Sequence, residues 1–334
     1  MVKVQITGIA RPFAAIMHIM NNLIKISHGP FTARLLPMGA TLNRFTYHDR
    51  DLILGFEQPD DHLTVPIYAG AIVGPIANRI AHGQVKIGQK LHTMQRNENG
   101  ETTLHSGDDG LHARIWSVKS QQSDRVVFQC DLPKGACGLP GQRRITTEYL
   151  LNDTGLQLTI TAKSDATTPM NIAHHPYWVL DQDQAETTLE IAAQHYLPTD
   201  ARGLPTGVVQ PVAETQFDYR VTKPIGPSST LDHNFCLAQS RHHDPRFAAR
   251  LIASDGLTLV IETTEPGLQV YAGSGLPDLV ENITFGAKSH PNAAIALEPQ
   301  GWPDAPNNTD FPSIFMQIDD VYRQVTCYRI SQQS

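Results

Sequence analysis

The alternation of apolar and polar residues is the feature of this sequence that most restricts its fold. In GLQLTITAK, residues 155–163, every second residue is apolar from Leu156 to Ala162, which is the period of a β-strand with one buried face. VVFQC, TTLEIAA, LTLVIET and LQVYAG are short apolar runs bounded by glycine, proline, aspartate or serine, as strands usually are. No long segment sustains the i, i+3, i+4 pattern of an amphipathic helix. The sequence therefore predicts an all-β protein.

Turn signals between these runs indicate how the strands are connected. DDG at 108–110, NDTG at 152–155 and SDG at 254–256 recur between apolar segments, which is typical of a meandering antiparallel sandwich. No glycine-rich or proline-rich linker divides the 334 residues, and large β-sandwiches often exceed the usual domain length. We therefore expect one domain over residues 21–334, with a long surface excursion from Pro198 to Pro227.

Composition and charge exclude several classes of function. Charged residues make up 18% of the chain and the net charge is −7, whereas a nucleic-acid partner requires a concentrated basic surface. The four cysteines show no CxxC spacing, so reduced thiols are expected. The apolar stretch from Pro12 to Met20 is far shorter than the ~20 residues of a membrane span. We expect a cytoplasmic protein with no nucleic-acid or membrane partner, and residues 1–20 as an extension outside the fold.

Three polar segments carry the residues best suited to chemistry. NIAHHPYW contains two adjacent histidines, ALEPQ places Glu298 at the end of an apolar run, and GPIANRI followed by TLHSG supplies an asparagine, an arginine and a histidine. Near neutral pH a glutamate can accept a proton and an imidazole can donate one. The other groups suit a ligand rich in hydroxyls. Together these segments predict acid/base chemistry on a sugar.

Strand alternation separates the two adjacent histidines. Neighbouring residues of a strand point to opposite faces, so His174 and His175 cannot both enter one pocket. Asn171, His175 and Tyr177 share a face by the same rule. At most one of the two histidines is therefore expected to take part in chemistry.

In their order and separations, these segments resemble the aldose 1-epimerase (galactose mutarotase) family. The resemblance covers most of the chain and includes NRI, LHSG, NIAHHPYW, LDHNF, LQVYAG and LEPQ. It implies a large antiparallel two-sheet β-sandwich of the galactose mutarotase type, with a ligand groove on one sheet. The implied activity is that of a cofactor-independent isomerase, which interconverts the α and β anomers of a free aldose by acid/base ring opening.

The resemblance also assigns roles to individual residues. It implies Glu298 as the base and His175 as the acid. The implied substrate-binding residues are Asn78, Arg79, His105, Asp232 and Gln269. Burial would raise the pKa of a glutamate and a nearby cation would lower it, so Arg79 is expected to keep Glu298 ionised. No metal site is expected, because no HExxH or HxH spacing occurs.

Four positions depart from the usual residues of this family. Pro75 stands where an arginine is common, and His174 stands where an asparagine is common. Pro176 and Trp178 stand where serine and phenylalanine are usual. These departures indicate a side branch whose substrate need not be galactose. A sugar phosphate is disfavoured, because it would require several converging basic side chains.

Two alternative functions stay open at the level of the sequence. A glycoside hydrolase would use Glu298 and Asp232 as a carboxylate pair. A non-catalytic sugar-binding protein would keep the groove without turnover, although binding alone requires neither a proton donor nor a base at these positions. The sequence does not name the sugar, and it leaves open a monomer or a homodimer.

Overall fold

The structure is a computed structural model that describes residues 23–65, 67–279 and 284–332. The expected N-terminal extension, residues 1–20, lies outside this part of the chain. Within it, the regular structure is almost entirely β-strand, with one four-residue α-helix, α2 (Asp61–Thr64), and short 3-10 turns. None of its helices is long and apolar enough to cross a membrane. The all-β class is confirmed.

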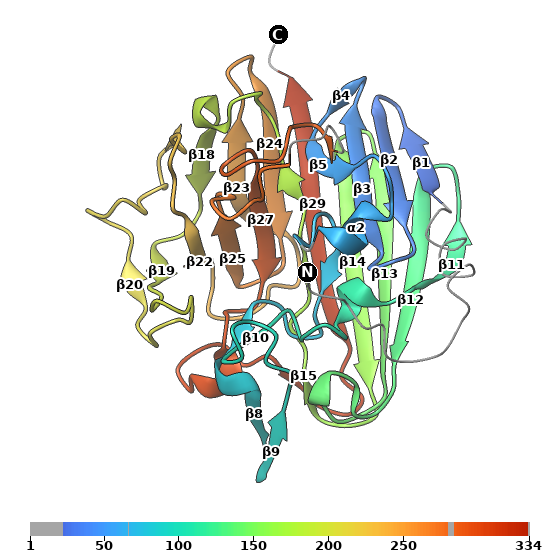
Figure 1. Cartoon of the computed structure of the whole chain (residues 1–334), viewed down its shortest axis with the longest axis vertical. Coiled ribbons are helices and arrows are strands. Elements are labelled where there is room, and N and C mark those ends of the chain that lie inside the picture. Colours follow the sequence, from blue (N-terminus) through green and yellow to red (C-terminus); the bar gives the residue numbers. More distant parts are fainter. Residues whose placement is uncertain (1–22, 66, 280–283, 333–334) are drawn as a thin grey trace.

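Two large antiparallel sheets form the body of the protein (Figure 1). The nine-stranded sheet has the order β11 (Ser117–Gln121), β12 (Arg125–Leu132), β13 (Arg143–Asn152), β14 (Gly155–Ser164), β29 (Tyr322–Gln332), β24 (Leu257–Thr263), β23 (Arg246–Ile252), β18 (Thr188–Ile191) and β21 (Lys223–Pro224). The eight-stranded sheet has the order β20 (Gln210–Pro211), β19 (His195–Leu197), β22 (Asp232–Cys236), β25 (Gly267–Tyr271), β27 (Ile295–Gln300), β17 (Tyr177–Trp178), β5 (Ile53–Phe56) and β26 (Thr284–Phe285).

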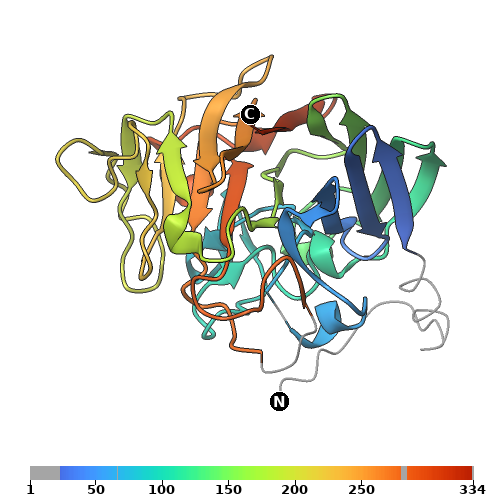
Figure 2. The same cartoon turned by 90° about the horizontal axis from the view of Figure 1, so that it is seen from above.

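Smaller sheets extend this framework. A four-stranded sheet, on the right in Figures 1 and 2, is formed by β1 (Ile24–His28), β2 (Phe31–Leu36), β3 (Thr41–Tyr47) and β4 (Arg50–Asp51). Two-stranded pairs are β7 (Arg79–Ile80) with β10 (Thr103–Leu104), β6 (Ile72–Val73) with β16 (Ala173–His174), β8 (Gln84–Ile87) with β9 (Lys90–Thr93), and β15 (Thr168–Pro169) with β28 (Phe315–Met316). Of these strands, β7 contains Arg79, and His105 and His175 directly follow β10 and β16.

The hairpin of β13 and β14 shows how sequence alternation produces the sheet. Buried and partly exposed residues alternate along most of both strands, and the strands pair from Arg143 opposite Ser164 to Asn152 opposite Gly155. Gly155 has φ +138°, and a Cβ atom there would lie 2.2 Å from the carbonyl oxygen of Tyr328. Only glycine fits this turn without displacing the neighbouring strand.

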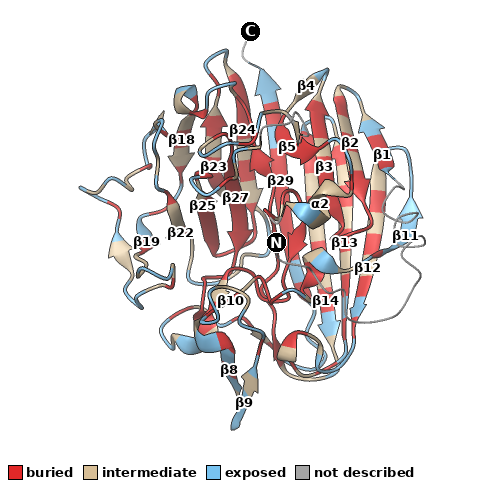
Figure 3. Ribbon diagram, viewed as in Figure 1, coloured by how far each residue is buried: buried red, intermediate tan, exposed pale blue. Residues whose placement is uncertain are grey.

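The main core lies between the two large sheets. Leu158 and Ile160 of β14 and Val270 of β25 are at most 1% exposed and belong to one apolar cluster. Fully burying a side chain of this size contributes roughly 1.5–3 kcal/mol. Figure 3 shows the same pattern, with buried residues concentrated on the central strands and exposed ones at β8, β9 and β11.

The region from 198 to 227 is more than the surface excursion that the sequence predicted. It lies at one end of the molecule, on the left in Figures 1 and 2. Its strands β20 and β21 extend an edge of each large sheet. Buried side chains anchor it at Leu204, Val212, Tyr219 and Ile225. The prediction was based on local Pro, Gly and Thr density, which hides these widely spaced apolar anchors.

Candidate active site

His175 and Glu298 face each other across two neighbouring strands of the eight-stranded sheet. Glu298 lies in β27, and β17 pairs with β27 through Tyr177 opposite Ala296. Continuing that register by two residues places His175 beside Glu298. The Nε2 atom of His175 lies 3.4 Å from Oε1 of Glu298, and both side chains are buried. A proton donor and a proton acceptor therefore lie side by side in the same site.

His174 points away from this contact, into the core between the sheets. Its ring packs against Tyr149 of β13 and Tyr328 of β29. Its Nδ1 atom lies 3.1 Å from the hydroxyl of Tyr328. The two adjacent histidines thus lie on opposite faces, in the arrangement expected from strand alternation.

His105 adds a second imidazole to the site from the turn after β10. Its ring centroid lies 5.4 Å from that of His175. The backbone N–H of Asn78 donates to Nδ1 of His105 at 3.1 Å, so the proton of the neutral ring resides on Nε2. The remaining ring nitrogen is therefore a hydrogen-bond donor.

His105, His175 and Glu298 could together hold a metal ion. One nitrogen or oxygen atom from each lies within 4.8 Å of the others. Neutral imidazoles and a carboxylate are ligands that zinc accepts. The sequence predicted no metal site. Whether this cluster binds a metal ion is therefore the question that tests that prediction.

Arg79, Asp232 and Gln269 form a polar wall beside the pair. Arg79 makes a two-point ion pair with Glu98 at 2.8 and 2.9 Å, and its Nη1 atom lies 3.7 Å from Asp232. Gln269 donates to Asp232 at 2.6 Å, and it is directly opposite Glu298 in the pairing of β25 with β27. The structure therefore links these side chains through one chain of polar contacts.

Asn78 lies at the edge of this wall. Its side-chain oxygen accepts from the backbone N–H of Arg79 at 2.8 Å, and its backbone has φ +61°. With Asp232 and Gln269 it lines a small cleft, to which Gly203 also contributes. All seven residues that the sequence indicated are thus in one connected region: Asn78, Arg79, His105, His175, Asp232, Gln269 and Glu298.

Burial favours the uncharged forms of His175 and Glu298. It lowers the pKa of His175 to about 4, so the imidazole is neutral at pH 7. Burial also raises the pKa of Glu298, and the charge of Asp232 raises it further. Arg79 acts in the opposite direction and lowers the pKa of Glu298. Arg79 therefore acts in the direction that the sequence analysis expected, but burial outweighs it and the pKa of Glu298 is still raised well above its ordinary value.

Sequence reasoning missed two residues of this region. The Tyr68 ring packs against both imidazoles, with centroids 4.7 Å from His105 and 6.0 Å from His175. Glu98 holds the guanidinium of Arg79. Neither has a local signal, because Tyr68 lies in an irregular segment and Glu98 in the polar turn NENGE.

Three aromatic or amide residues that could have faced a ligand have other contacts. Trp178 packs against Phe45 and Tyr328 in the core. Trp302 is buried, and its indole N–H donates to the carbonyl of Pro266. The side-chain amide of Asn171 makes hydrogen bonds with both backbone groups of Gly301. Core packing, which is the commoner role of a buried tryptophan, describes both tryptophans.

Comparison with known proteins finds relatives along nearly the whole chain. The sequence model of a family described as aldose 1-epimerase matches residues 22–329. Galactose mutarotase of Rattus norvegicus is 33% identical over 315 residues, which cover 89% of this chain and 90% of the rat protein. Aldose 1-epimerase of Escherichia coli (strain K12) is 31% identical over 320 residues, with 88% and 90% coverage.

Solved structures agree with these relatives. The crystal structure of a GalM/aldose epimerase homologue from C. elegans has a TM-score of 0.85 at 30% identity, and covers 94% of this chain and 99% of that one. Galactose 1-epimerase from Lactobacillus acidophilus has a TM-score of 0.80 at 25% identity, with 94% and 99% coverage. The predicted two-sheet sandwich of the galactose mutarotase type is confirmed.

Proposed function

The chain belongs to the aldose 1-epimerase family, and from this membership we propose which residues catalyse the reaction. The protein is an isomerase that interconverts the α and β anomers of a free aldose. Glu298 is the base and His175 is the acid. The observation that carries this assignment is the 3.4 Å contact between the two buried side chains.

Ring opening removes a proton from the anomeric hydroxyl oxygen and adds a proton to the ring oxygen, and both oxygens are bonded to the hemiacetal carbon C1. Glu298 accepts the proton of the anomeric hydroxyl while His175 donates its proton to the ring oxygen. The bond from C1 to the ring oxygen breaks, and C1 becomes the carbonyl carbon of the open aldehyde. Rotation about the C1–C2 bond and the reverse transfers close the other anomer. Each positioned proton carrier typically contributes about 10²- to 10⁴-fold to the rate.

At neutral pH the protonation state of His175 fits its role, and that of Glu298 depends on the charges around it. His175 has a pKa of about 4, so it donates from a neutral ring N–H rather than from an imidazolium. Glu298 must be ionised to accept a proton, and the positive charge of Arg79 favours that form. Hydrogen bonds from sugar hydroxyls would favour it further.

The remaining site residues hold the sugar. The Nε2–H of His105 donates toward the ring oxygen, because its Nδ1 atom is already occupied by Asn78. Asp232 presents acceptor oxygens to sugar hydroxyls, and its contacts with Gln269 and Arg79 fix its orientation. Asn78 completes the same wall.

The relatives and the contacts of Glu298 give no support to the two alternatives. The relatives carry the names of mutarotases and epimerases rather than hydrolases. Glu298 has a histidine within ion-pair distance, and Asp232 is bonded to Gln269 and paired with Arg79. A proton donor facing a base serves turnover, and binding alone has no use for it.

Polarimetry of freshly dissolved α-D-glucose and α-D-galactose tests this function. The protein should accelerate the approach to anomeric equilibrium well above the spontaneous rate. The rate should be the same with and without EDTA, because proton transfer between Glu298, the sugar and His175 needs no Lewis acid. Absence of acceleration at high enzyme concentration would favour the binding protein, and loss of activity in EDTA would show that the histidine cluster holds a required metal.

A further inference from the structure

The β-ladder between β17 and β27, the strand that carries the base, stops two residues short of the acid. Backbone pairing between β17 and β27 covers Tyr177 and Trp178, and Pro176 follows directly after the acid. The backbone of His175 is bonded instead to Ala71 and Gly70, on the opposite side. The separation of the catalytic pair therefore depends on contacts other than the β-ladder.

Two side-chain bridges span this opening in the ladder. In the first, the amide of Asn171 bonds both backbone groups of Gly301, accepting from its N–H at 2.7 Å and donating to its carbonyl at 3.3 Å. A Cβ atom on residue 301 would lie 3.1 Å from the Asn171 oxygen. This bridge begins four residues before the acid and ends three residues after the base.

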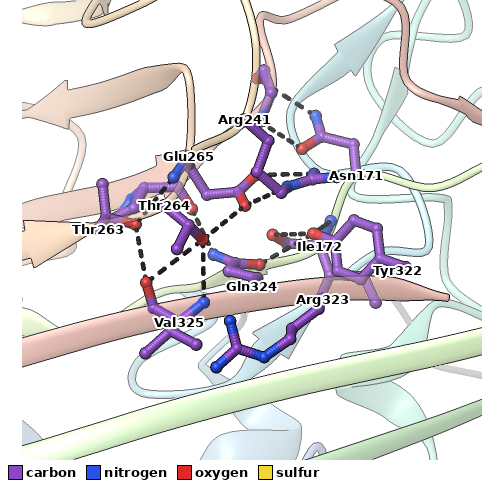
Figure 4. Close-up of polar contacts among 12 residues, drawn as sticks. Asn171, Ile172, Arg241, Thr263, Thr264, Glu265, Tyr322, Arg323, Gln324 and Val325 are labelled. Atoms are coloured by element: carbon purple, nitrogen blue, oxygen red, sulfur yellow. Dashed lines mark hydrogen bonds and ion pairs between the residues drawn. The ribbon is translucent and has the colours of Figure 1, made fainter. Parts of the chain in front are cut away.

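The second bridge comes from β29, a strand of the other large sheet (Figure 4). The backbone N–H of Ile172 donates to the Tyr322 hydroxyl at 3.2 Å, and that hydroxyl donates to the side-chain oxygen of Gln324 at 2.9 Å. The amide nitrogen of Gln324 then donates to the carbonyl of Pro299 at 3.0 Å. One continuous chain of hydrogen bonds thus joins the backbone three residues before His175 to the residue after Glu298.

Tyr322 is itself held in place by a partly buried ion pair. The guanidinium of Arg241 lies 4.3 Å from the centre of the Tyr322 ring and bonds Glu265 at 2.5 and 2.9 Å. Glu265 is 1% exposed. Burial raises the pKa of Tyr322, which keeps the phenol protonated and able to donate. Figure 4 shows this pair beside the bridge.

We propose that Tyr322 and Gln324 are positioning residues for the acid/base pair. They act where the β-ladder has ended and fix the distance between His175 and Glu298. The proposal rests on the catalytic roles assigned above. Removing the Tyr322 hydroxyl would leave the Ile172 N–H and the Gln324 oxygen without a partner in a buried region. The backbone beside His175 would then shift relative to β27, and misplacement by about 1 Å can lower a catalytic rate by about 10²-fold.

The test compares Tyr322→Phe with Tyr149→Phe. Tyr149 is also fully buried, and its hydroxyl makes one hydrogen bond, to the carbonyl of Ala40 at 2.7 Å. We expect Tyr322→Phe to lower kcat by about 10- to 100-fold, with KM within about twofold of wild type and an altered pH profile of kcat. Tyr149→Phe should lower the melting temperature comparably and leave kcat and its pH profile unchanged.

A second variant ensures that the test does not depend on Tyr322→Phe alone. Gln324→Leu breaks the same bridge at its other end and should lower kcat similarly. The double variant should be no slower than the slower single variant, because both changes break one chain. The proposal is overturned if Tyr322→Phe matches Tyr149→Phe in kcat, if the two effects simply multiply, or if both bridge variants fail to fold. If wild type itself shows no mutarotation, the proposed function fails first.

Discussion

Arg79 acts on two carboxylates of the site, Asp232 and Glu298. It is held by Glu98 through two hydrogen bonds and lies 3.7 Å from Asp232. Its charge lowers the pKa of Glu298, whereas burial and Asp232 raise it. A buried glutamate can act as a base only if some neighbour offsets its desolvation. Arg79 provides part of this effect, and Glu98 fixes where the guanidinium lies.

The first prediction concerns the acid and the base themselves. His175→Asn and Glu298→Gln each remove a proton carrier while keeping a similar volume. Each should lower the kcat of mutarotation by at least about 10²-fold, because a positioned acid or base contributes on that order. Polarimetry or coupled anomer-specific oxidation measures kcat, and circular dichroism checks the fold. Full activity in either variant would remove that residue from the mechanism.

His174→Asn is the matched control for the histidine variant. The His174 ring lies in the core against Tyr149 and Tyr328, on the face opposite His175. We expect kcat to stay within about twofold of wild type, while lost packing lowers stability by about 1–3 kcal/mol, the usual cost of a core change of this kind. If His174 proves essential for turnover and His175 does not, the assignment of the two faces is wrong.

At the scale of the elements, the loop before β20 is coupled to substrate binding through a glycine. Gly203 has φ +74°, and a Cβ atom there would lie 2.7 Å from the guanidinium carbon of Arg79. Gly203→Ala should displace Arg79 and raise KM about tenfold, with a smaller effect on kcat. The expected size corresponds to about 1.4 kcal/mol of binding.

Gly207→Ala separates this effect from backbone strain. Gly207 lies in the same loop with φ +85°, but its nearest neighbour to an added Cβ is the Asn308 side chain at 3.3 Å. Both substitutions place alanine in a left-handed conformation and so strain the backbone. Of the two, only Gly203→Ala places a Cβ atom against Arg79. Steady-state kinetics of the two variants should therefore differ in KM. Equal KM values would show that the loop does not act through Arg79.

Sequence alternation predicts the strands well where one face of a sheet is buried and the other is partly exposed. The 155–163 segment is such a case, and it forms most of β14. The short strands β16 and β17 were found through motif resemblance rather than period, because two residues show no alternation. The Tyr322–Gln324 bridge had no signal at all. Its partners Ile172 and Pro299 are distant in sequence, and only tertiary packing brings them together.

At the scale of the whole molecule, buried histidines make stability depend on pH. Burial lowers the pKa of His112 and His175 to about 4 and that of His174 to about 3. In the unfolded chain these groups titrate near 6.5. Between these values the unfolded chain binds protons that the folded protein does not. Their contribution is therefore complete above pH 6.5 and is lost as the pH falls through about 4.

Thermal unfolding between pH 7.5 and 4 tests this prediction. The melting temperature should fall as the pH is lowered. His174→Asn removes one titrating group, so the slope of the unfolding free energy against pH should decrease by up to about 1.4 kcal/mol per pH unit. The raised pKa values of the Glu298, Asp109 and Asp304 carboxyls act in the opposite sense, but these groups are fewer than the described histidines whose pKa is lowered. An unchanged slope in His174→Asn would show that this histidine is protonated in the folded protein.

The four departures from the usual family residues bear unequally on substrate choice. His174 and Trp178 face the core, so they do not shape the groove. Pro75 accepts a hydrogen bond from the backbone N–H of Asn171, and Pro176 follows the acid directly. An effect on specificity would therefore have to come from these two prolines, which stand beside the segment that carries His175.

The last prediction is measured on a panel of free sugars: glucose, galactose, xylose, arabinose and fucose. A site that hydrogen-bonds each hydroxyl leaves buried polar groups unpaired when one hydroxyl is inverted or missing. Asp232 and Gln269 are such groups, because a 2.6 Å hydrogen bond between them fixes their orientation. We expect at least one sugar to be turned over, epimers to differ in kcat/KM by about tenfold or more, and galactose not to be clearly the best. A clear preference for galactose would show that Pro75 and Pro176 do not change the substrate specificity of this protein.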